Sequence, residues 1–209
     1  MSRRSASPDL ADLPAITAII LCGGRATRLG GIEKPLIDLG GTLLLAHVIA
    51  RLEPMVDNLV LSVGQPSERY EQFGYPVVAD EHPGQGPLAG IVSALAAVHT
   101  PWILTTPADT PFLPPHLVAA LAPACARRGA VVASAGGHRQ NLSMLLDRQQ
   151  AAALAGFYRS GGRAVHRWLV ANGIDEVEFP KDCFFNINTP DDLARARAAA
   201  ACRSRRPSG

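Results

Sequence analysis

The chain lacks several features that mark whole classes of protein. Its four cysteines are widely spaced among 209 residues and form no C-x-x-C pair, so neither a disulfide framework nor a cysteine zinc site is indicated. Its six histidines show neither H-x-H nor H-E-x-x-H spacing, which argues against a zinc enzyme. No apolar run reaches the roughly 18 residues that a membrane-spanning helix needs. These absences predict a globular protein of the reducing cytoplasm.

Charge is also scarce, and lysine is the scarcest basic residue. Only Lys34 and Lys181 are lysines among 20 basic residues, and the formal net charge is +2. Residues 203–209 carry three arginines, without which the charge is −1. A nucleic-acid surface needs a broad basic face, so no nucleic acid is expected as a partner. We expect a disordered leader at 1–14 that is not a secretory signal, a single domain at 15–201 and a basic disordered tail at 202–209.

Apolar and amphipathic segments alternate along the chain. The pattern predicts strands at 16–21, 58–63, 76–78, 102–105, 130–134, 141–146 and 175–179. It predicts helices at 43–52, 87–98, 115–128, 149–159, 163–171 and 190–201. Such alternation is typical of a three-layer α/β fold, with a mostly parallel twisted sheet and helices on both faces. Ligands of such folds gather at the carboxyl ends of the strands.

The most informative segment is the glycine-rich loop after the first strand, Leu21-Cys22-Gly23-Gly24-Arg25-Ala26-Thr27-Arg28-Leu29-Gly30-Gly31-Ile32-Glu33-Lys34. Glycines let backbone N–H groups approach an anion, and Arg25, Arg28 and Lys34 add positive charge. Pro35 after Lys34 excludes a Walker A loop, and the adjacent glycines exclude a dinucleotide fingerprint. We interpret Cys22 as a small loop residue rather than a nucleophile. The segment predicts a polyphosphate-binding loop.

Three later segments supply candidate polar groups. Asp109 lies between two prolines after a predicted strand, where one carboxylate can join Mg²⁺ to phosphate oxygens. Gly84-Gln85-Gly86-Pro87-Leu88-Ala89-Gly90 predicts a tight turn into a helix whose N-terminus favours an anion, although a purely structural turn is the alternative. Asp80 can bind a nucleobase or ribose, but its segment alone favours a turn aspartate.

The last candidate segment is Phe184-Phe185-Asn186-Ile187-Asn188-Thr189-Pro190. If it is extended, alternation places Asn186 and Asn188 on one face, where their amides can hold a metal-bound water, a phosphate or a polar acceptor. The alternative for Asn188 is a turn residue before the last helix.

Together these segments resemble one family, the molybdenum cofactor guanylyltransferases. The matching pieces are Leu21 to Lys34, Gly86-Pro87-Leu88-Ala89-Gly90, Pro107-Ala108-Asp109-Thr110-Pro111 and Phe185-Asn186-Ile187-Asn188-Thr189-Pro190-Asp191. They occur in the family order, and the resemblance runs from about Ile16 to Arg197. Many nucleotidyltransferases share the glycine loop, whereas its combination with G-P-L-A-G and N-I-N-T-P is more specific.

The resemblance implies an enzyme that transfers GMP from GTP to the terminal phosphate of Mo-molybdopterin and releases pyrophosphate, with Mg²⁺ as cofactor. It implies catalytic roles for Lys34, Asp109 and Arg28, and metal binding by Asp109. The implied nucleotide-binding residues are Leu21, Cys22, Gly23, Gly24, Arg25, Lys34, Asp80, Gly86, Pro87, Leu88 and Asp109. The implied acceptor-binding residues are Asn186, Asn188 and Arg139. Transient contacts with molybdoenzyme apoproteins or delivery chaperones are also expected, for a monomer or weak oligomer without membrane contact.

Two departures from the family pattern concern the site. Ser62 aligns where some members have asparagine, and Asn141-Leu142 aligns where many have His-Pro. Any polar contacts with the acceptor in this segment must then come from Arg139, Gln140 and Asn141. Two other functions stay open from the residues: a cytidylyltransferase of the same fold acting on a molybdopterin or other phosphorylated acceptor, and a non-catalytic molybdopterin-binding delivery protein.

Overall fold

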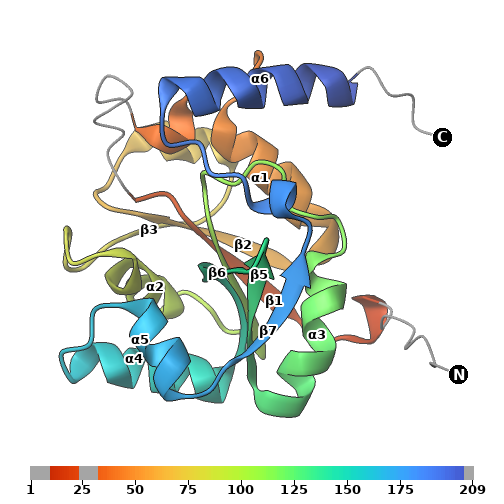
Figure 1. Ribbon diagram of the computed structural model, residues 1–209. Helices are drawn as coiled ribbons and strands as arrows, with labels where there is room; N and C mark the ends of the chain where they lie inside the picture. Colours follow the sequence, from red (N-terminus) through yellow and green to blue (C-terminus); the bar gives the residue numbers. More distant parts are fainter. Residues whose placement is uncertain (1–9, 24–32, 205–209) are drawn as a thin grey trace, which may run out of the picture.

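The structure, a computed structural model, describes residues 10–23 and 33–204 (Figure 1). These residues form a seven-stranded sheet in the order β3-β2-β1-β4-β6-β5-β7. The strands are β1 Ile16–Leu21, β2 Asn58–Val63, β3 Val77–Ala79, β4 Trp102–Pro107, β5 Ala130–Ala135, β6 His138–Asp147 and β7 Asp175–Phe179. All neighbouring pairs are parallel except those of β6, which is antiparallel to β4 and β5. The predicted α/β fold with a mostly parallel sheet is confirmed.

Helices cover both faces of this sheet (Figure 1). They are α1 Leu44–Leu52, α2 Pro87–Leu95, α3 Leu117–Arg128, α4 Arg148–Arg159, α5 Val165–Ala171 and α6 Pro190–Ser204. Short 3₁₀ segments are η1 Leu10–Asp12, η3 Lys34–Leu36, η4 Glu53–Met55, η5 Glu68–Phe73 and η6 Lys181–Phe184. Within the described ranges, no helix is both long enough and apolar enough to cross a bilayer.

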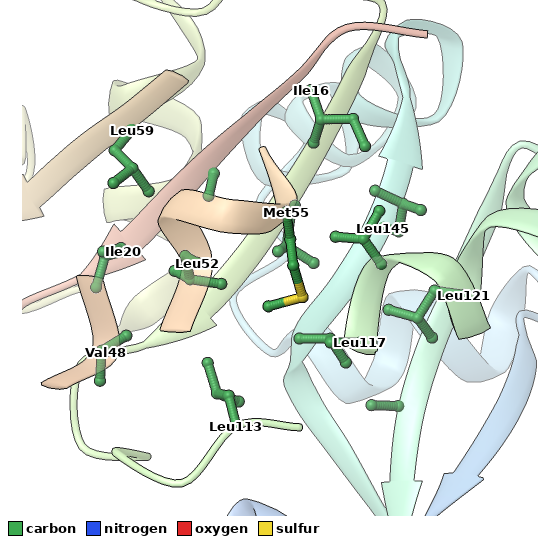
Figure 2. Close-up of a cluster of buried hydrophobic side chains, with 14 of the residues drawn as sticks. Ile16, Ile20, Val48, Leu52, Met55, Leu59, Leu113, Leu117, Leu121 and Leu145 are labelled. Atoms are coloured by element: carbon green, nitrogen blue, oxygen red, sulfur yellow. The ribbon is translucent and has the colours of Figure 1, made fainter. Parts of the chain in front are cut away.

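Two apolar clusters, one on each face of the sheet, make up most of the core. On one face, side chains of α1 and α3 pack against alternate residues of β1, as Figure 2 shows for Ile16, Ile20, Leu52 and Leu117. On the other face, α2, α4 and α5 pack against the intervening residues such as Ile19. All six residues of β1 are buried, because a central strand covered on both faces exposes neither side. The central strands are therefore held firmly from both faces.

Strand register brings the carboxyl ends of four strands together at one edge of the sheet. Leu21, the last residue of β1, pairs with Ser62 of β2 on one side and with Pro107 of β4 on the other. Ala79, which ends β3, pairs with Val63. The segments that follow these strands consequently emerge at one edge of the sheet, as expected for parallel strands.

The sixth strand is longer than predicted and turns back on β5. It was expected at 141–146 but spans His138–Asp147, because Gly136 and Gly137, with φ of 59° and 75°, form a two-residue hairpin turn. Gly-Gly favours such turns because both positions need positive φ. Helix α2 ends at Leu95 rather than residue 98. The predicted leader at 1–14 includes η1, and α6 continues to Ser204, past residue 201.

Helix α6 lies outside the main layers, above α1 in Figure 1. A third small cluster joins it to the rest of the molecule through Leu39, Leu44, Phe112, Ile187 and Ala196. Ile187 is fully buried there and lies one residue before Asn188. The packing of α6 therefore fixes the backbone from which Asn188 extends.

Candidate nucleotide site

A cavity of about 580 Å³ lies at the carboxyl ends of β1, β2 and β4. Cavities of this size are typical of small-molecule sites. Its lining residues come from the ends of those strands, from the segments after β3 and β4, and from the start of α2. They are Leu21, Gly23, Lys34, Pro35, Ser62, Val63, Gly64, Asp80, Gly84, Gly86, Pro87, Gly90, Pro107, Ala108, Asp109, Leu142 and Asn188.

Lys34, Asp109 and Asn188 form the polar cluster of this cavity. The Lys34 ammonium donates to Asp109 Oδ2 and, at 2.6 Å, to Asn188 Oδ1. The side chains of Lys34 and Asp109 are 15 % and 20 % exposed, so the pair is largely withdrawn from water but remains accessible from the cavity. Residues separated by up to 154 positions in the chain thus meet around one ammonium group. Such a largely buried but accessible pair can exchange its mutual contact for contacts with a charged ligand.

Asp109 is held by the backbone on both of its sides. The Ala108 N–H donates to the Leu21 carbonyl at 3.0 Å, which extends the pairing of β4 with β1 by one residue. The Asp109 carbonyl accepts from the Ile187 N–H at 3.2 Å, and Thr110 Oγ1 donates to the Pro107 carbonyl at 2.9 Å. These bonds hold the backbone from which the Asp109 carboxylate extends, as a preorganised charged group requires.

Asn188 is held by a reciprocal cap at the start of α6. Asp192 Oδ2 accepts from the N–H groups of Asn188 at 3.1 Å and Thr189 at 3.0 Å, while the Asp192 N–H donates to Thr189 Oγ1 at 3.1 Å. This is a capping box with aspartate at its third helical position. The hydrogen bond from the Thr189 side chain, followed by those from the two backbone N–H groups, holds the pKa of Asp192 below its usual range. Asn188 is therefore both a turn residue and a member of the cavity wall.

Asp80 and the start of α2 form the opposite wall. Asp80 lines the cavity, and its Oδ1 also accepts from the His82 N–H at 2.9 Å in an Asx turn. Gly86 precedes α2 with φ of 88°, Pro87 opens the helix, and no side chain caps it. The exposed N-terminus thus keeps the partial positive charge that attracts anions.

Gly90 has a packing role within this wall. A Cβ at position 90 would lie 2.7 Å from Ser62 Oγ, and Ser62 Oγ already donates to the Gly90 carbonyl at 3.0 Å. Only glycine lets the first turn of α2 approach β2 this closely. The final glycine of G-P-L-A-G therefore has a packing role in addition to lining the cavity with Gly86 and Pro87.

Several residues expected at the site are placed elsewhere. Cys22 is 4 % exposed, its Sγ bonds the Ile20 carbonyl, and burial, with a smaller effect of Glu33, raises its pKa. Its side chain therefore belongs to the core, and only its backbone can face a ligand. Leu88 is fully buried in the core beneath α2, and neither residue lines the cavity.

The expected acceptor residues are only partly brought together. Asn188 lines the cavity, whereas Asn186 is exposed and Arg139 Nε donates to Glu176 Oε1 at 3.0 Å on the β7 side of the sheet. Neither Asn186 nor Arg139 is among the lining residues. Gly24, Arg25 and Arg28 lie outside the described residues.

The cavity also includes residues that were not predicted as binding groups. Ser62, Val63 and Gly64 follow from the position of β2 beside β1, and the rule that ligands gather at carboxyl strand ends could have indicated them. Leu142 comes from the antiparallel β6, where Thr105 Oγ1 donates to its carbonyl at 2.8 Å. The sequence indicated this segment only through the alignment of Asn141-Leu142 with the family's His-Pro, and Leu142 itself was not predicted to bind, because the hairpin that places β6 beside β4 was not recognised.

The oxygen atoms of Asp109 and Asn188 fit a hard cation. Both side chains reach the same ammonium group, so their donor oxygens converge on one point of the cavity. Mg²⁺ usually takes one or two carboxylates and completes its coordination with phosphate oxygens and water. Among the described residues, no three His, Cys, Asp or Glu side chains form a metal cluster. The donor set suits a cation shared with a phosphorylated ligand better than a metal held by protein alone.

Solved structures share this fold. Molybdopterin-guanine dinucleotide biosynthesis protein A from Archaeoglobus fulgidus aligns with a TM-score of 0.69 and 25 % identity, over 89 % of this chain and 99 % of that chain. The 2-C-methyl-D-erythritol 4-phosphate cytidylyltransferase of Thermus thermophilus aligns with the same TM-score at 20 % identity, over 88 % and 98 % of the two chains, which shows the shared fold. Fold and site together define an α/β nucleotidyltransferase.

Sequence comparison narrows this class to one family. The family model described as "MobA-like NTP transferase domain" matches residues 18–175, and the chain belongs to that family. The molybdenum cofactor guanylyltransferase of Cupriavidus taiwanensis is 38 % identical over 187 residues, covering 85 % of this chain and 94 % of the relative. That of Rhodopseudomonas palustris is 40 % identical over 208 residues, covering 94 % and 99 %. The resemblance inferred from the motifs is confirmed.

Proposed function

We propose that this chain is a molybdenum cofactor guanylyltransferase that transfers GMP from GTP to the terminal phosphate of Mo-molybdopterin. The observation that carries the proposal is the meeting of Lys34, Asp109 and Asn188 in a cavity at the carboxyl ends of β1, β2 and β4. The curated relatives that cover most of the chain are named for this activity. A cavity lined by the Lys34 ammonium and the Asn188 amide suits an anionic ligand such as a nucleoside triphosphate.

The cavity divides into a phosphate side and a nucleoside side. Lys34 and Asp109 lie on the phosphate side, and Gly23 begins the glycine-rich loop there. Asp80 and Gly86 form the opposite wall, where Asp80 is proposed to face the guanine nucleoside. Asn188 is proposed to bind the acceptor, and Gly24, Arg25 and Arg28 are proposed to complete the phosphate loop.

The reaction requires no general base from the protein. A terminal phosphate oxygen of the acceptor is already ionised near pH 7. As it bonds to the α-phosphorus of GTP, the bond from that phosphorus to the β-phosphate bridging oxygen breaks, and pyrophosphate leaves with the electron pair. Two anions must approach one another, so the protein acts by positioning them and offsetting their charge.

Lys34 and Asp109 divide this electrostatic work. The Lys34 ammonium is proposed to leave its contact with Asp109 and bind phosphate oxygens, offsetting the charge that develops on pyrophosphate. Asp109, with Asn188, is proposed to hold Mg²⁺. When bound, Mg²⁺ supplies charge neutralisation on the phosphate oxygens.

The cellular setting is also a proposal. We place the reaction in the cytoplasm, with transient contacts to molybdoenzyme apoproteins or delivery chaperones that receive the product. Cys22 and Cys125, two buried cysteines that form no disulfide, agree with a reducing compartment.

The deciding experiment measures Mg²⁺-dependent pyrophosphate release from GTP, CTP and ATP, with and without a molybdopterin acceptor of shown activity. Release that requires GTP and acceptor together is the expected result. Release only from CTP would keep the fold and the chemistry but overturn the choice of nucleotide. Nucleotide binding without release from any of the three would favour a delivery protein.

A further inference from the structure

The nucleoside wall of the cavity is the 80–86 loop, whose start is held to β2 and α2 where the Asp80 N–H donates to the Val63 carbonyl at 2.8 Å and the Glu81 N–H to Ser93 Oγ at 3.0 Å. Residues 81–87 are all exposed, and Gly84 and Gly86 adopt positive φ of 86° and 88°. Glycines at such positions leave a loop many conformations when it is not otherwise held. Asp80, Gly84 and Gly86 face the cavity from this loop. Any contact that orders this loop therefore also fixes the nucleoside wall of the unliganded cavity.

Tyr158 contacts two residues of this loop, His82 and Gln85, from outside the cavity. Its hydroxyl donates to Gln85 Oε1 at 3.0 Å, and the His82 ring stacks on the Tyr158 ring, with centroids 6.3 Å apart and planes inclined by 29°. Gln85 is also tied to His82, because its N–H donates to the His82 carbonyl at 3.3 Å. The loop is thus attached to α4 through side chains, and α4 packs beside α2 in Figure 1.

Tyr158 is itself rigidly held. It is 7 % exposed and belongs to the core cluster that includes Leu154 and Trp168. The Arg163 guanidinium lies 4.5 Å from the centre of the Tyr158 ring, on the loop that joins α4 to α5. Arg163 also donates to the Tyr158 carbonyl at 3.0 Å. The Arg163 guanidinium over the ring and its hydrogen bond to the Tyr158 carbonyl fix the position of the hydroxyl that donates to Gln85.

We propose that Tyr158 is a positioning residue for the nucleotide, which it serves by holding the 80–86 loop through Gln85. The inference rests on the proposed function, because it assigns this loop to the nucleoside side of the transfer reaction. Tyr158 does not line the cavity and lies on a different element from Lys34 and Asp109. Its loss should therefore weaken nucleotide binding without slowing the chemical step, since a preordered loop lowers the entropy cost of binding.

The test uses Tyr158→Phe, which removes one hydroxyl and keeps the ring that His82 and Arg163 contact. We expect the KM for GTP to rise about 3- to 10-fold, as for the loss of one neutral hydrogen bond, with kcat and the KM for the acceptor within about twofold. Gln85→Leu should give the same shift. Because both act through one bond, the double variant should show no further increase.

Tyr75→Phe is the matched control. It also removes a tyrosine hydroxyl that bonds a side chain, in this case Glu53, away from the cavity. It should leave the KM for GTP unchanged. A wild-type KM in Tyr158→Phe, or fully additive effects of Tyr158→Phe and Gln85→Leu, would overturn the proposal.

Amide hydrogen exchange of the unliganded protein separates this inference from the proposed function. In Tyr158→Phe, residues 81–86 should exchange faster than in wild type, while the β1 and β4 amides stay unchanged. Unchanged exchange in the loop contradicts the tether even if GTP is the substrate. Faster exchange, with KM rising for CTP instead of GTP, supports the tether and rejects the guanylyltransferase assignment.

Discussion

Lys34 illustrates how one residue acquires its role from its neighbours. It is one of two lysines in the chain, and its ammonium lies between a carboxylate and an amide contributed by distant segments. A compact ammonium can move between such partners and a phosphate, whereas the planar arginine group binds in a fixed fork. This explains why lysine occurs here in a chain that otherwise prefers arginine.

Replacing Lys34 by methionine should lower kcat/KM for GTP by about 10²-fold or more, because the uncompensated charge then lies on the leaving pyrophosphate. Steady-state pyrophosphate release measures the effect. Lys181→Met is the matched control, since Lys181 is the other lysine and is exposed on η6. Equal activities of the two variants would remove Lys34 from the chemistry.

Asp109→Ala should lower turnover by at least about 10²-fold and weaken the response to Mg²⁺ concentration. The loss follows from removing the carboxylate that is proposed to hold the cation. Activity titrated against Mg²⁺ checks both effects, with the exposed Asp182→Ala as control. Near-normal turnover and an unchanged Mg²⁺ midpoint would exclude Asp109 from the mechanism.

At the scale of elements, close approach of α2 to β2 shapes the nucleoside wall. Gly90→Ala places a Cβ 2.7 Å from Ser62 Oγ, and overpacking of this kind costs about 1–3 kcal/mol. For a chain of this length the melting temperature should fall by about 2–4 °C per kcal/mol. Calorimetry of Gly90→Ala and of the double variant with Ser62→Ala tests the cause. The second change should recover part of the loss, because it removes the atom that clashes.

The cap of α6 should make stability depend on pH. The pKa of Asp192 is lowered in the folded protein, so its stabilising effect is complete above the ordinary aspartate pKa of about 3.9 and is lost as the pH falls through the folded value. Asp192→Asn should therefore lower the melting temperature at pH 7, and the difference from wild type should shrink near pH 3. A difference of equal size at both pH values would contradict the assigned role of the charge.

At the scale of the whole molecule, three parallel strand ends and the α6 segment enclose one cavity. A ligand that binds only the folded state raises its stability by about 2.7 kcal/mol at 100 times its Kd. GTP with Mg²⁺ should therefore raise the melting temperature by about 5–10 °C, and CTP and ATP by less. Thermal melts with each nucleotide check this. A larger shift with CTP would favour a cytidylyltransferase.

Much of the fold was predictable because it depends on local patterns. β1 and β2 have the predicted limits, since apolar, β-branched runs are strong strand signals, and β7 has them through its alternation of charged and apolar residues. The β5–β6 hairpin was missed, although Gly136-Gly137 is a local turn signal, because the predicted strand began only at residue 141. The antiparallel direction of β6 followed from that turn.

The candidate site was less predictable than the fold, because side-chain placement depends on long-range packing. Loop chemistry alone singled out Lys34 and Asp109, and the family resemblance added Asp80; all three line the cavity, because glycine, proline and charge patterns are local. The same motifs also contained Cys22 and Leu88, whose side chains are buried because their backbone positions turn them toward the core. Arg139 was expected near the acceptor but bonds Glu176, which reaches it through the pairing of β5 with β6 and β7.

Residue order alone was thus enough to establish the α/β class, the family and the loops that carry charge, because periodicity and motif spacing are properties of the chain. Folding was needed to bring Lys34 within hydrogen-bond distance of Asn188, 154 positions away, and to attach the nucleoside loop to Tyr158. Such contacts arise from strand register and helix packing, which combine preferences of many distant residues. Short-range sequence patterns do not record that combination.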